Sequence, residues 1–311
     1  MIATQRQVKE GIQYRNLRLL SPEEAVYLYE FRDITPEGLE TAFRYLRPFL
    51  YFTYRNLRER GLFATFSPQT GMEVPQEKSL RAGRLELGEK RLTGRRVGSF
   101  TVVENAEELY YNHWFGQFGL YKIAKGKLLF LDPYESYYLQ ERGLLQLDIP
   151  RPKFYSLYKY WRDRGWVIKS GYKFGTVFRV YPYGTSPQHF RHSLFLLEPQ
   201  SSGMAWWEAS RAIRVSHGVR KHFLVEAGAP APAAAPFLYV RKERWRWLVM
   251  PVSEDERLST TKLWALWHLA QEHRLIPLVA VADRDTATSF YRLGLIHLGE
   301  RAFFSIDWTR L

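Results

Sequence analysis

The sequence predicts a mixed α/β (α+β) protein built around small mixed sheets, in which one structural unit occurs twice. Between residues 152 and 225, apolar residues recur first at helical spacing, then at strand spacing, and then at helical spacing again. Two segments near the N-terminus repeat the pattern of two segments in the middle of the chain. With 311 residues, the chain is long enough to bury a substantial core and to hold two or three compact units.

The middle of the chain carries the most regular pattern. Tyr155, Tyr158 and Trp161 lie at helical spacing, and Gly165 follows where a helix would end. The segments that follow are predicted as strands at 166–168, 178–181 and 193–197, a helix from 208, and a strand that ends at 225. Tyr181, His192 and Lys221 each lie at the end of one of these elements, where loops hold polar groups on a rigid scaffold.

An internal repeat connects the N-terminal part with the middle of the chain. LSPEEAVYLYE (20–30) matches LDPYESYYLQE (131–141), and YFTYRNLRERG (51–61) matches YSLYKYWRDRG (155–165). The first copy breaks off after Phe66, and residues 67–98 are rich in Gly, Pro and basic residues, which indicates loop and linker.

The missing half of the first copy is predicted near the C-terminus. Residues 259–294 indicate a helix, a strand, a turn and a strand. Arg274 and Leu278 align there with Arg220 and Leu224, SFYR aligns with FLYVR, and Leu275 stands at the position of Lys221. We therefore expect residues 45–66 and 259–294 to pack together as a degenerate copy that is split by an inserted unit.

This hypothesis divides the chain into five parts. They are an N-terminal half of the degenerate structural unit (1–75), a basic linker (76–102), an N-terminal domain of the complete unit (103–150), its main domain (151–245), and a C-terminal half of the degenerate unit (246–311). Phe237–Arg241 is compatible with either unit, and the Ala/Pro-rich stretch 227–236 is typical of a semi-stiff spacer.

Composition narrows the class of protein. The formal charge of +13, together with 20 Tyr and 10 Trp, favours a polyanionic partner, although basic composition alone is also compatible with simple solubility. The absence of cysteine excludes disulfides and thiolate metal sites. The chain has no apolar run long enough for a membrane span and begins without an apolar signal core, so we expect a cytoplasmic protein without a membrane partner.

The motifs RDRGWVIKSGYKFG, FRVYPYG, RHS and VRK occur in order within residues 151–226. In this order the segment resembles the catalytic domain of archaeal tRNA-splicing endonucleases, and residues 108–147 resemble that family's small N-terminal domain. The resemblance implies an endonuclease with Tyr181, His192 and Lys221 as catalytic residues. It also implies that Arg214 clamps an extruded base, with Arg241 as a candidate for a second clamping arginine. His189 remains an alternative to His192, which is favoured by the Ser193 that follows it.

The family reaction is the attack of a 2′-hydroxyl on its own 3′-phosphate, which needs a base, an acid and positive charge. Histidine is suited to act as the acid, and lysine to hold the charged oxygens. Tyrosine has an ordinary pKa of about 10, so a tyrosine base needs cations nearby. Arg179, Arg191, Arg214 and Arg220 are available in this stretch. The resemblance thus implies metal-free and cofactor-free cleavage of precursor tRNA at a bulge-helix-bulge, giving 2′,3′-cyclic phosphate and 5′-hydroxyl ends.

A small acidic loop suggests a partner. Asp283 and Asp285 lie in the DRDTA segment, where the family carries an acidic loop that docks on the opposite protomer; a plain turn is the alternative. The docking interpretation implies a homodimer. Two other functions are alternatives. A non-catalytic RNA-binding subunit would lack one of the three catalytic residues, and none is missing. A metal-dependent nuclease would need clustered carboxylates on adjacent strands, whereas this unit offers Asp163 on the helix but no such strand pair.

Overall fold

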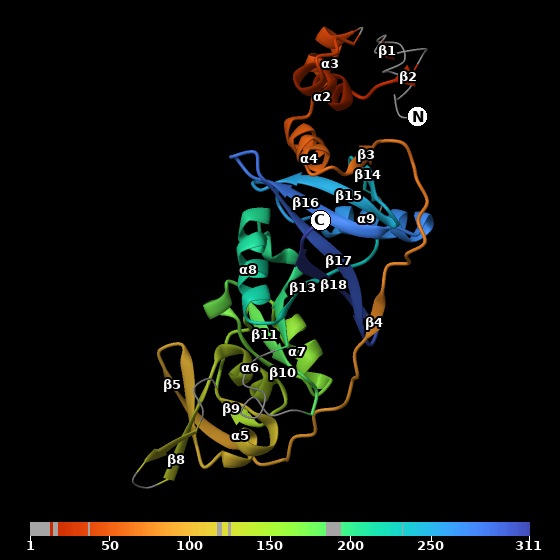
Figure 1. The fold of residues 1–311 in the computed structure, drawn as a ribbon. Helices are drawn as coiled ribbons and strands as arrows, with labels where there is room; N and C mark the ends of the chain where they lie inside the picture. Colours follow the sequence, from red (N-terminus) through yellow and green to blue (C-terminus); the bar gives the residue numbers. More distant parts are fainter. Residues whose placement is uncertain are drawn as a thin grey trace.

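The computed structural model describes residues 13–14, 18–36, 38–116, 120–123, 126–184, 194–231 and 233–311. It is an elongated, mixed α/β structure in which one long sheet connects two outer parts (Figure 1). The N-terminal helices lie at one end, and a second, smaller sheet lies at the other (Figure 1). The predicted mixed α/β class is therefore confirmed.

The N-terminal part is mostly helical. Its elements are β1 (Gln13–Tyr14), β2 (Arg18–Leu19), α2 (Pro22–Arg32), α3 (Leu39–Tyr45), α4 (Pro48–Glu59) and β3 (Phe63–Thr65). Helix α2 begins with a capping box, in which Ser21 accepts a hydrogen bond from the backbone of Glu24 and the Glu24 carboxylate accepts one from the backbone of Ser21.

The small sheet comes next in the sequence. This part of the chain contains β4 (Glu77–Ser79), β5 (Leu92–Val97), β6 (Phe100–Glu104), α5 (Glu107–His113), β7 (Leu120–Ile123), β8 (Gly126–Leu131), α6 (Pro133–Glu141) and β9 (Leu145–Gln146). The sheet order is β7-β8-β6-β5-β9, while β4 pairs with the long sheet. The stretch 76–102, which we expected to be a linker, thus contains β4, β5 and the start of β6. Helix α6 begins with the same capping box as α2, formed by Asp132 and Glu135.

The segment with the predicted site residues follows. It contains α7 (Tyr155–Asp163), β10 (Val167–Ser170), the 3-10 turn η1 (Tyr172–Phe174), β11 (Phe178–Tyr181), β12 (Phe195–Glu198), the 3-10 turn η2 (Gln200–Ser202), α8 (Trp206–Gly218) and β13 (His222–Glu226). The order agrees with the predicted helix, strands, helix and strand.

The C-terminal part completes the long sheet. Its elements are β14 (Leu238–Lys242), β15 (Trp245–Ser253), α9 (Thr260–His273), β16 (Ile276–Ala282), β17 (Thr288–Leu298) and β18 (Arg301–Thr309). The sheet order is β10-β11-β12-β13-β18-β17-β16-β15-β14-β3.

The long sheet consists of two halves with the same pairing pattern. We call them the β10 half (β10–β13 and β18) and the β3 half (β3 and β14–β17). In each half, counted from its outer strand, the first and second pairings are antiparallel, the third is parallel with a helix as the crossover, and the fourth is antiparallel. The crossover helices are α8 and α9, and the halves meet at the antiparallel pair β17–β18. The sequence left the unit of Phe237–Arg241 open, and β14 pairs within the β3 half.

One sequence alignment and one expected domain boundary differ from these positions. SFYR lies on β17, the fifth strand of the β3 half, whereas FLYVR lies on β14, its second strand, so the two segments do not occupy equivalent places. The fifth strand of the β10 half is instead β18, which lies outside the range 151–245 expected for the main domain. The sequence could not predict these positions, because the residue pattern of a strand does not determine which other strand pairs with it.

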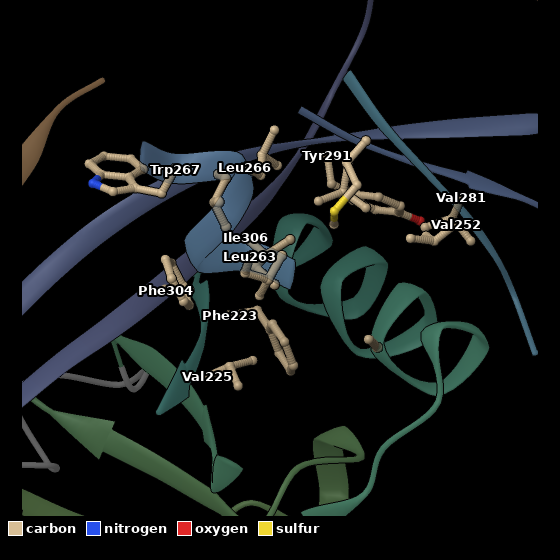
Figure 2. Packing of buried hydrophobic residues seen from close by; sticks show 14 of the residues in the cluster. Phe223, Val225, Val252, Leu263, Leu266, Trp267, Val281, Tyr291, Phe304 and Ile306 are labelled. Carbon is tan, nitrogen blue, oxygen red and sulfur yellow. The ribbon is translucent and has the colours of Figure 1, made fainter. Parts of the chain in front are cut away.

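Buried side chains form three clusters. One contains α6 and α7 residues such as Tyr138 and Trp161, against the β10 half. A second joins α4 to the β3 half, with Leu57 packed in the same cluster as Leu278. The third is shared between halves: Phe223 of β13, Leu263 of α9 and Ile306 of β18 pack together, as Figure 2 shows. Segments 45–66 and 259–294 are therefore in contact, as the split-copy hypothesis requires.

Candidate active site

Three strand ends lie side by side at one edge of the β10 half. Val180 pairs with Phe195, and Phe195 pairs with His222. The row one position further contains Tyr181, Leu194 and Lys221; the Leu194 amide donates to the Val180 carbonyl (2.9 Å), and the His222 amide donates to the Leu194 carbonyl (3.1 Å). Tyr181 and Lys221 are therefore two strand spacings apart, roughly 10 Å between backbones.

Tyr181 and Lys221 lie on the same face of the sheet. Because side chains alternate along a strand, Val180 and Phe195 pack toward α7, whereas Leu196 and Phe223 pack toward α8. The same alternation places Tyr181 and Lys221 on the α8 face. Both are buried, with 5% and 4% of their surface exposed. A phenol and an ammonium group thus extend from the same face of one rigid sheet, two strand spacings apart.

Lys221 is placed by the turn between α8 and β13. Its amide donates to the Ser216 carbonyl at the end of α8 (2.8 Å), and the preceding Arg220 has a left-handed backbone, with φ +55°. Its Nζ lies 5.1 Å from the centre of the Phe174 ring in η1. Burial, with the nearby positive charge of Arg179, lowers the pKa of Lys221. Nothing in the described part of the chain forms an ion pair with this ammonium.

Arg179 lies next to both candidate groups. Its guanidinium carbon is 5.9 Å from the centre of the Tyr181 ring, and its charge acts on Lys221. The Nε of Arg179 is buried and has no hydrogen-bond partner among the described residues. An unpartnered buried donor beside two other polar groups fits a site that receives an anionic ligand. Sequence reasoning noted Arg179 only as one of several nearby cations.

The third predicted residue lies outside the described residues. His192, its alternative His189, and Arg191 fall in the gap between residues 184 and 194. Leu194, the first described residue after this gap, belongs to the row that contains Tyr181 and Lys221.

The loop after Tyr181 is held by close packing. The ring of Tyr183 lies against Gly165 at the end of α7 and against Gly83, so that a Cβ on either glycine would approach the ring to 2.5 Å or less. The guanidinium of Arg81 lies 5.3 Å from the same ring. Arg81, Arg84 and Tyr183 line an open cleft beside this loop. Sequence reasoning missed this contact because residues 80–85 read only as linker.

The two predicted RNA-binding arginines lie in different halves. Arg214 is exposed on α8, and its Nε donates to the Ser210 carbonyl of the same helix (3.3 Å). Arg241 is exposed on β14, where it pairs with Phe63 of β3. The structure therefore brings Arg214 near the Lys221 end of α8 and leaves Arg241 in the β3 half.

The acidic loop connects β16 and β17. The Asp283 carboxylate accepts a hydrogen bond from the Ala287 amide (2.8 Å), which closes the turn. Arg284 between the two aspartates pairs with Asp255 (2.8 Å). Asp285 is exposed.

Carboxylates do not gather at the candidate site. In the part of the chain that is described, no group of three or more His, Asp or Glu side chains is arranged to hold a metal ion. Asp163 accepts hydrogen bonds from Tyr138 (2.7 Å) and Arg142 (2.5 Å). Among the described residues, no helix has the length and apolar character needed to span a bilayer.

Two family models match adjacent, slightly overlapping parts of the chain. The N-terminal domain of tRNA intron endonucleases matches residues 88–161, and their catalytic C-terminal domain matches residues 152–227. The tRNA-splicing endonuclease of Pyrobaculum islandicum is 34% identical over an alignment of 148 residues, which covers 39% of this chain and 80% of the relative. That of Methanopyrus kandleri is 34% identical over 160 residues (44% and 85%), and that of Thermococcus kodakarensis 35% over 156 residues (43% and 86%).

The chain belongs to the tRNA-splicing endonuclease family. The predicted family and the prediction of an enzyme are thereby confirmed. The family's catalytic match contains Tyr181, His192, Arg214 and Lys221, whereas Arg241 and the acidic loop lie outside both matches. The β3 half lies largely outside them as well.

Proposed function

We propose that the chain cleaves intron-containing precursor tRNA at bulge-helix-bulge junctions, without a metal, leaving 2′,3′-cyclic phosphate and 5′-hydroxyl ends. The observation that carries this proposal is the row of strand ends in which Tyr181 and Lys221 flank Leu194, two residues after His192. A tyrosine and a lysine of the types the reaction needs thus lie at the ends of neighbouring strands of one sheet, and His192 is two residues before this row in the sequence.

Each side chain has one role in the proposed step. Tyr181 takes the proton of the 2′-hydroxyl as its oxygen forms a bond to phosphorus, and His192 gives a proton to the 5′-oxygen as the P–O5′ bond breaks. Lys221 holds the non-bridging oxygens, where negative charge accumulates. Its low exposure and the unpaired state of its ammonium in the described structure support this role. Arg179 adds a second positive charge beside the Tyr181 ring.

Arg214 and Arg241 are proposed to contact the RNA rather than the reacting atoms. A guanidinium plane stacks well on a base that has left the helix, and bulges provide such bases. Arg214 is exposed on the helix that leads to Lys221, so a base held there would lie near the cleaved bond.

The β3 half is proposed to be the degenerate copy, divided as 1–75 and 246–311, with 103–150 and 151–245 as the two domains of the catalytic unit and β18 as its closing strand. The identical pairing pattern of the two halves supports this division. Asp283 and Asp285 are proposed to dock on a second copy, which would give a symmetric homodimer with two catalytic sites, one for each junction.

The test is cleavage of a labelled precursor tRNA in EDTA, with analysis of both new ends. His192→Ala should lower the single-turnover rate at saturating enzyme by about 100-fold or more, because proton transfer by a positioned group contributes that much. His189→Ala, three positions away, is the matched control and should cleave at the wild-type rate.

Three results would contradict the proposal. Loss of cleavage in EDTA with recovery in Mg²⁺ would indicate a metal-dependent nuclease. Binding of precursor tRNA without any cleavage by the wild type would indicate a non-catalytic subunit. Equal rates for His192→Ala and the wild type would remove the histidine from the mechanism.

A further inference from the structure

The equal pairing of the two halves identifies the counterpart of Tyr181. Helices α7 and α4 both end at a glycine with a left-handed backbone, Gly165 (φ +78°) and Gly61 (φ +75°). Two residues later, Val167 pairs with Tyr181 in the β10 half, and Phe63 pairs with Arg241 in the β3 half. Arg241 therefore occupies the place in the β3 half that Tyr181 has in the β10 half.

The counterpart of Lys221 follows from the next strands. Phe195 pairs with His222 across the parallel pair of one half, and Trp247 pairs with Ile276 in the other. The residues just before them are Lys221 and Leu275. Each of these two follows an arginine with φ +55°, so the two turns have the same local geometry. The catalytic ammonium thus has an apolar counterpart.

The segment that follows β3 packs against the turn that carries Leu275. The amide of Gly71 donates to the His273 carbonyl (2.9 Å), and a Cβ on Gly71 would lie 2.5 Å from the Arg274 carbonyl oxygen and 3.1 Å from both Arg246 and Leu275. No room remains there for a phosphate to reach Leu275. The adjoining end of the sheet, around the turn between β14 and β15, is basic and aromatic.

Two exposed aromatic rings lie beside unpaired arginines at this end of the sheet, Phe63 on the face toward α9 and Trp245 on the face toward α4. Phe63, 38% exposed, lies between the guanidinium groups of Arg241 (4.3 Å from the ring centre) and Arg58 (5.7 Å). Trp245, 39% exposed, has Arg244 at 5.2 Å and stacks on Trp247. Among the residues described, no carboxylate forms an ion pair with Arg58, Arg241 or Arg244. We call Arg58, Phe63, Arg241, Arg244 and Trp245 the β3 patch.

We propose that the β3 patch binds unpaired nucleotides of the RNA substrate, away from the cleaved bond. Aromatic rings flanked by arginines match single-stranded RNA, because bases stack on the rings and guanidinium groups while phosphates are neutralised. Charge supports this occupant: RKERWR (241–246) has four basic residues and one acidic residue. That the RNA is precursor tRNA rests on the proposed function, whereas the chemistry of the patch does not.

The position of the patch determines its effect. Arg241 and Tyr181 are seven strand spacings apart in the sheet order, roughly 34 Å at about 4.8 Å each. The patch cannot contact the scissile phosphate held by Tyr181 and Lys221. It should therefore act on RNA affinity and not on the reacting atoms.

The test measures RNA affinity and cleavage separately. Affinity is measured on the His192→Ala background, with precursor tRNA and with an unstructured RNA oligonucleotide. Adding Arg241→Ala and Arg244→Ala should raise Kd about tenfold or more for both RNAs and lower the slope of log K against log salt by about 1.4, because each single-strand phosphate contact contributes about 0.7. Trp245→Ala should raise Kd about tenfold through lost stacking, with the slope unchanged. With wild-type His192, Arg244→Ala and Trp245→Ala should each raise the enzyme concentration that gives half of the saturated single-turnover rate, in step with Kd.

Arg55→Ala is the matched control. Arg55 lies on α4, as Arg58 does, and over an aromatic ring (Phe31, 4.7 Å), but it is already paired with Glu59 (2.8 Å), so Kd should not change. Unchanged Kd in the patch variants, an equal effect of Arg55→Ala, or an altered oligomeric state with unchanged Kd would overturn the proposal. Failure of the wild type to cleave would contradict the proposed function alone, since oligonucleotide binding still tests the patch.

Discussion

Asp132 is a buried carboxylate at the start of α6. Its Oδ1 accepts a hydrogen bond from the Glu135 amide (2.8 Å), and Glu135 in turn forms a buried ion pair with Lys169 of β10. Burial, with the neighbouring Glu135 carboxylate as the second cause, raises the pKa of Asp132 to about 7. This group therefore couples the folding of the small N-terminal domain to pH.

Asp132→Asn should remove one part of the pH dependence of stability. The carboxyl pKa is about 3.9 in the unfolded chain and about 7 in the folded chain, so the folded state holds its proton over a range where the unfolded state has lost it. This term makes the free energy of unfolding fall as pH rises from about 4 to about 7, by at most about 1.4 kcal/mol per pH unit, and leaves it constant above. Asparagine keeps the acceptor for the helix cap and cannot titrate.

Urea denaturation between pH 4 and 8 checks this expectation. The fall between pH 4 and 7 should be smaller in Asp132→Asn than in the wild type. Parallel curves for the two proteins would contradict the assignment of this titration to Asp132.

At the residue scale, the sequence could predict groups that belong to local motifs. Ser21 and Asp132 each precede a Pro and a Glu three positions on, and both capping boxes form. Tyr181 and Lys221 could be placed at strand ends because the apolar pattern of the strands beside them is also local. The contacts of Lys221 with Phe174 and Arg179 could not be predicted, because they depend on how β11, β12 and β13 pair.

At the scale of elements, the two helix-ending glycines differ in what surrounds them. Nothing lies within 4 Å of a Cβ built on Gly61, whereas a Cβ on Gly165 would lie 2.5 Å from the Tyr183 ring. That ring is confined on another side by Gly83. Gly165 therefore serves two purposes: it ends α7, and it leaves space for the loop that follows Tyr181.

Alanine substitution should separate these purposes. Gly61→Ala should cost about 1–2 kcal/mol of stability, because a left-handed backbone is unfavourable for a residue with a Cβ. Gly165→Ala should cost about 1–3 kcal/mol more through the clash with Tyr183, and it should slow cleavage as the loop shifts. Denaturation midpoints and single-turnover rates of both variants check this. Equal losses for both variants would show that the Tyr183 contact has no consequence.

The helices and strands themselves could be predicted better than the pairing of the strands. RERG and RDRG indicated both helix ends, because a left-handed glycine has a local signature. The sequence could not predict that β14 joins β3 and β15 while β18 joins β13, because these pairings connect distant segments. Strand β5 was missed because its Gly and Arg residues resemble those of a loop.

At the scale of the whole molecule, the acidic loop is the candidate contact with a second copy. The carboxylate of Asp285 is exposed, whereas that of Asp283 also closes its own turn. Asp283→Lys with Asp285→Lys should convert dimers to monomers, because two attractive charges become repulsive. Asp285→Lys alone keeps the turn hydrogen bond and should weaken the dimer.

Sedimentation velocity at low salt and at high salt measures this effect. Glu86→Lys with Glu89→Lys changes the charge equally at two other exposed positions and should leave the dimer intact. A dimer of unchanged stability in the Asp283→Lys, Asp285→Lys variant would contradict the docking role of the loop.

The pairing of β13 with β18 also has a consequence for the newly made protein. Strand β18 is translated after all other strands of the long sheet, yet it contributes Phe303 to the cluster that surrounds α7. A ribosome-bound chain has already made Tyr181 and Lys221 while the β10 half still lacks the strand that pairs with β13. That half would thus gain its last strand only after the whole β3 half has been translated, and premature termination products that stop before residue 301 would lack it.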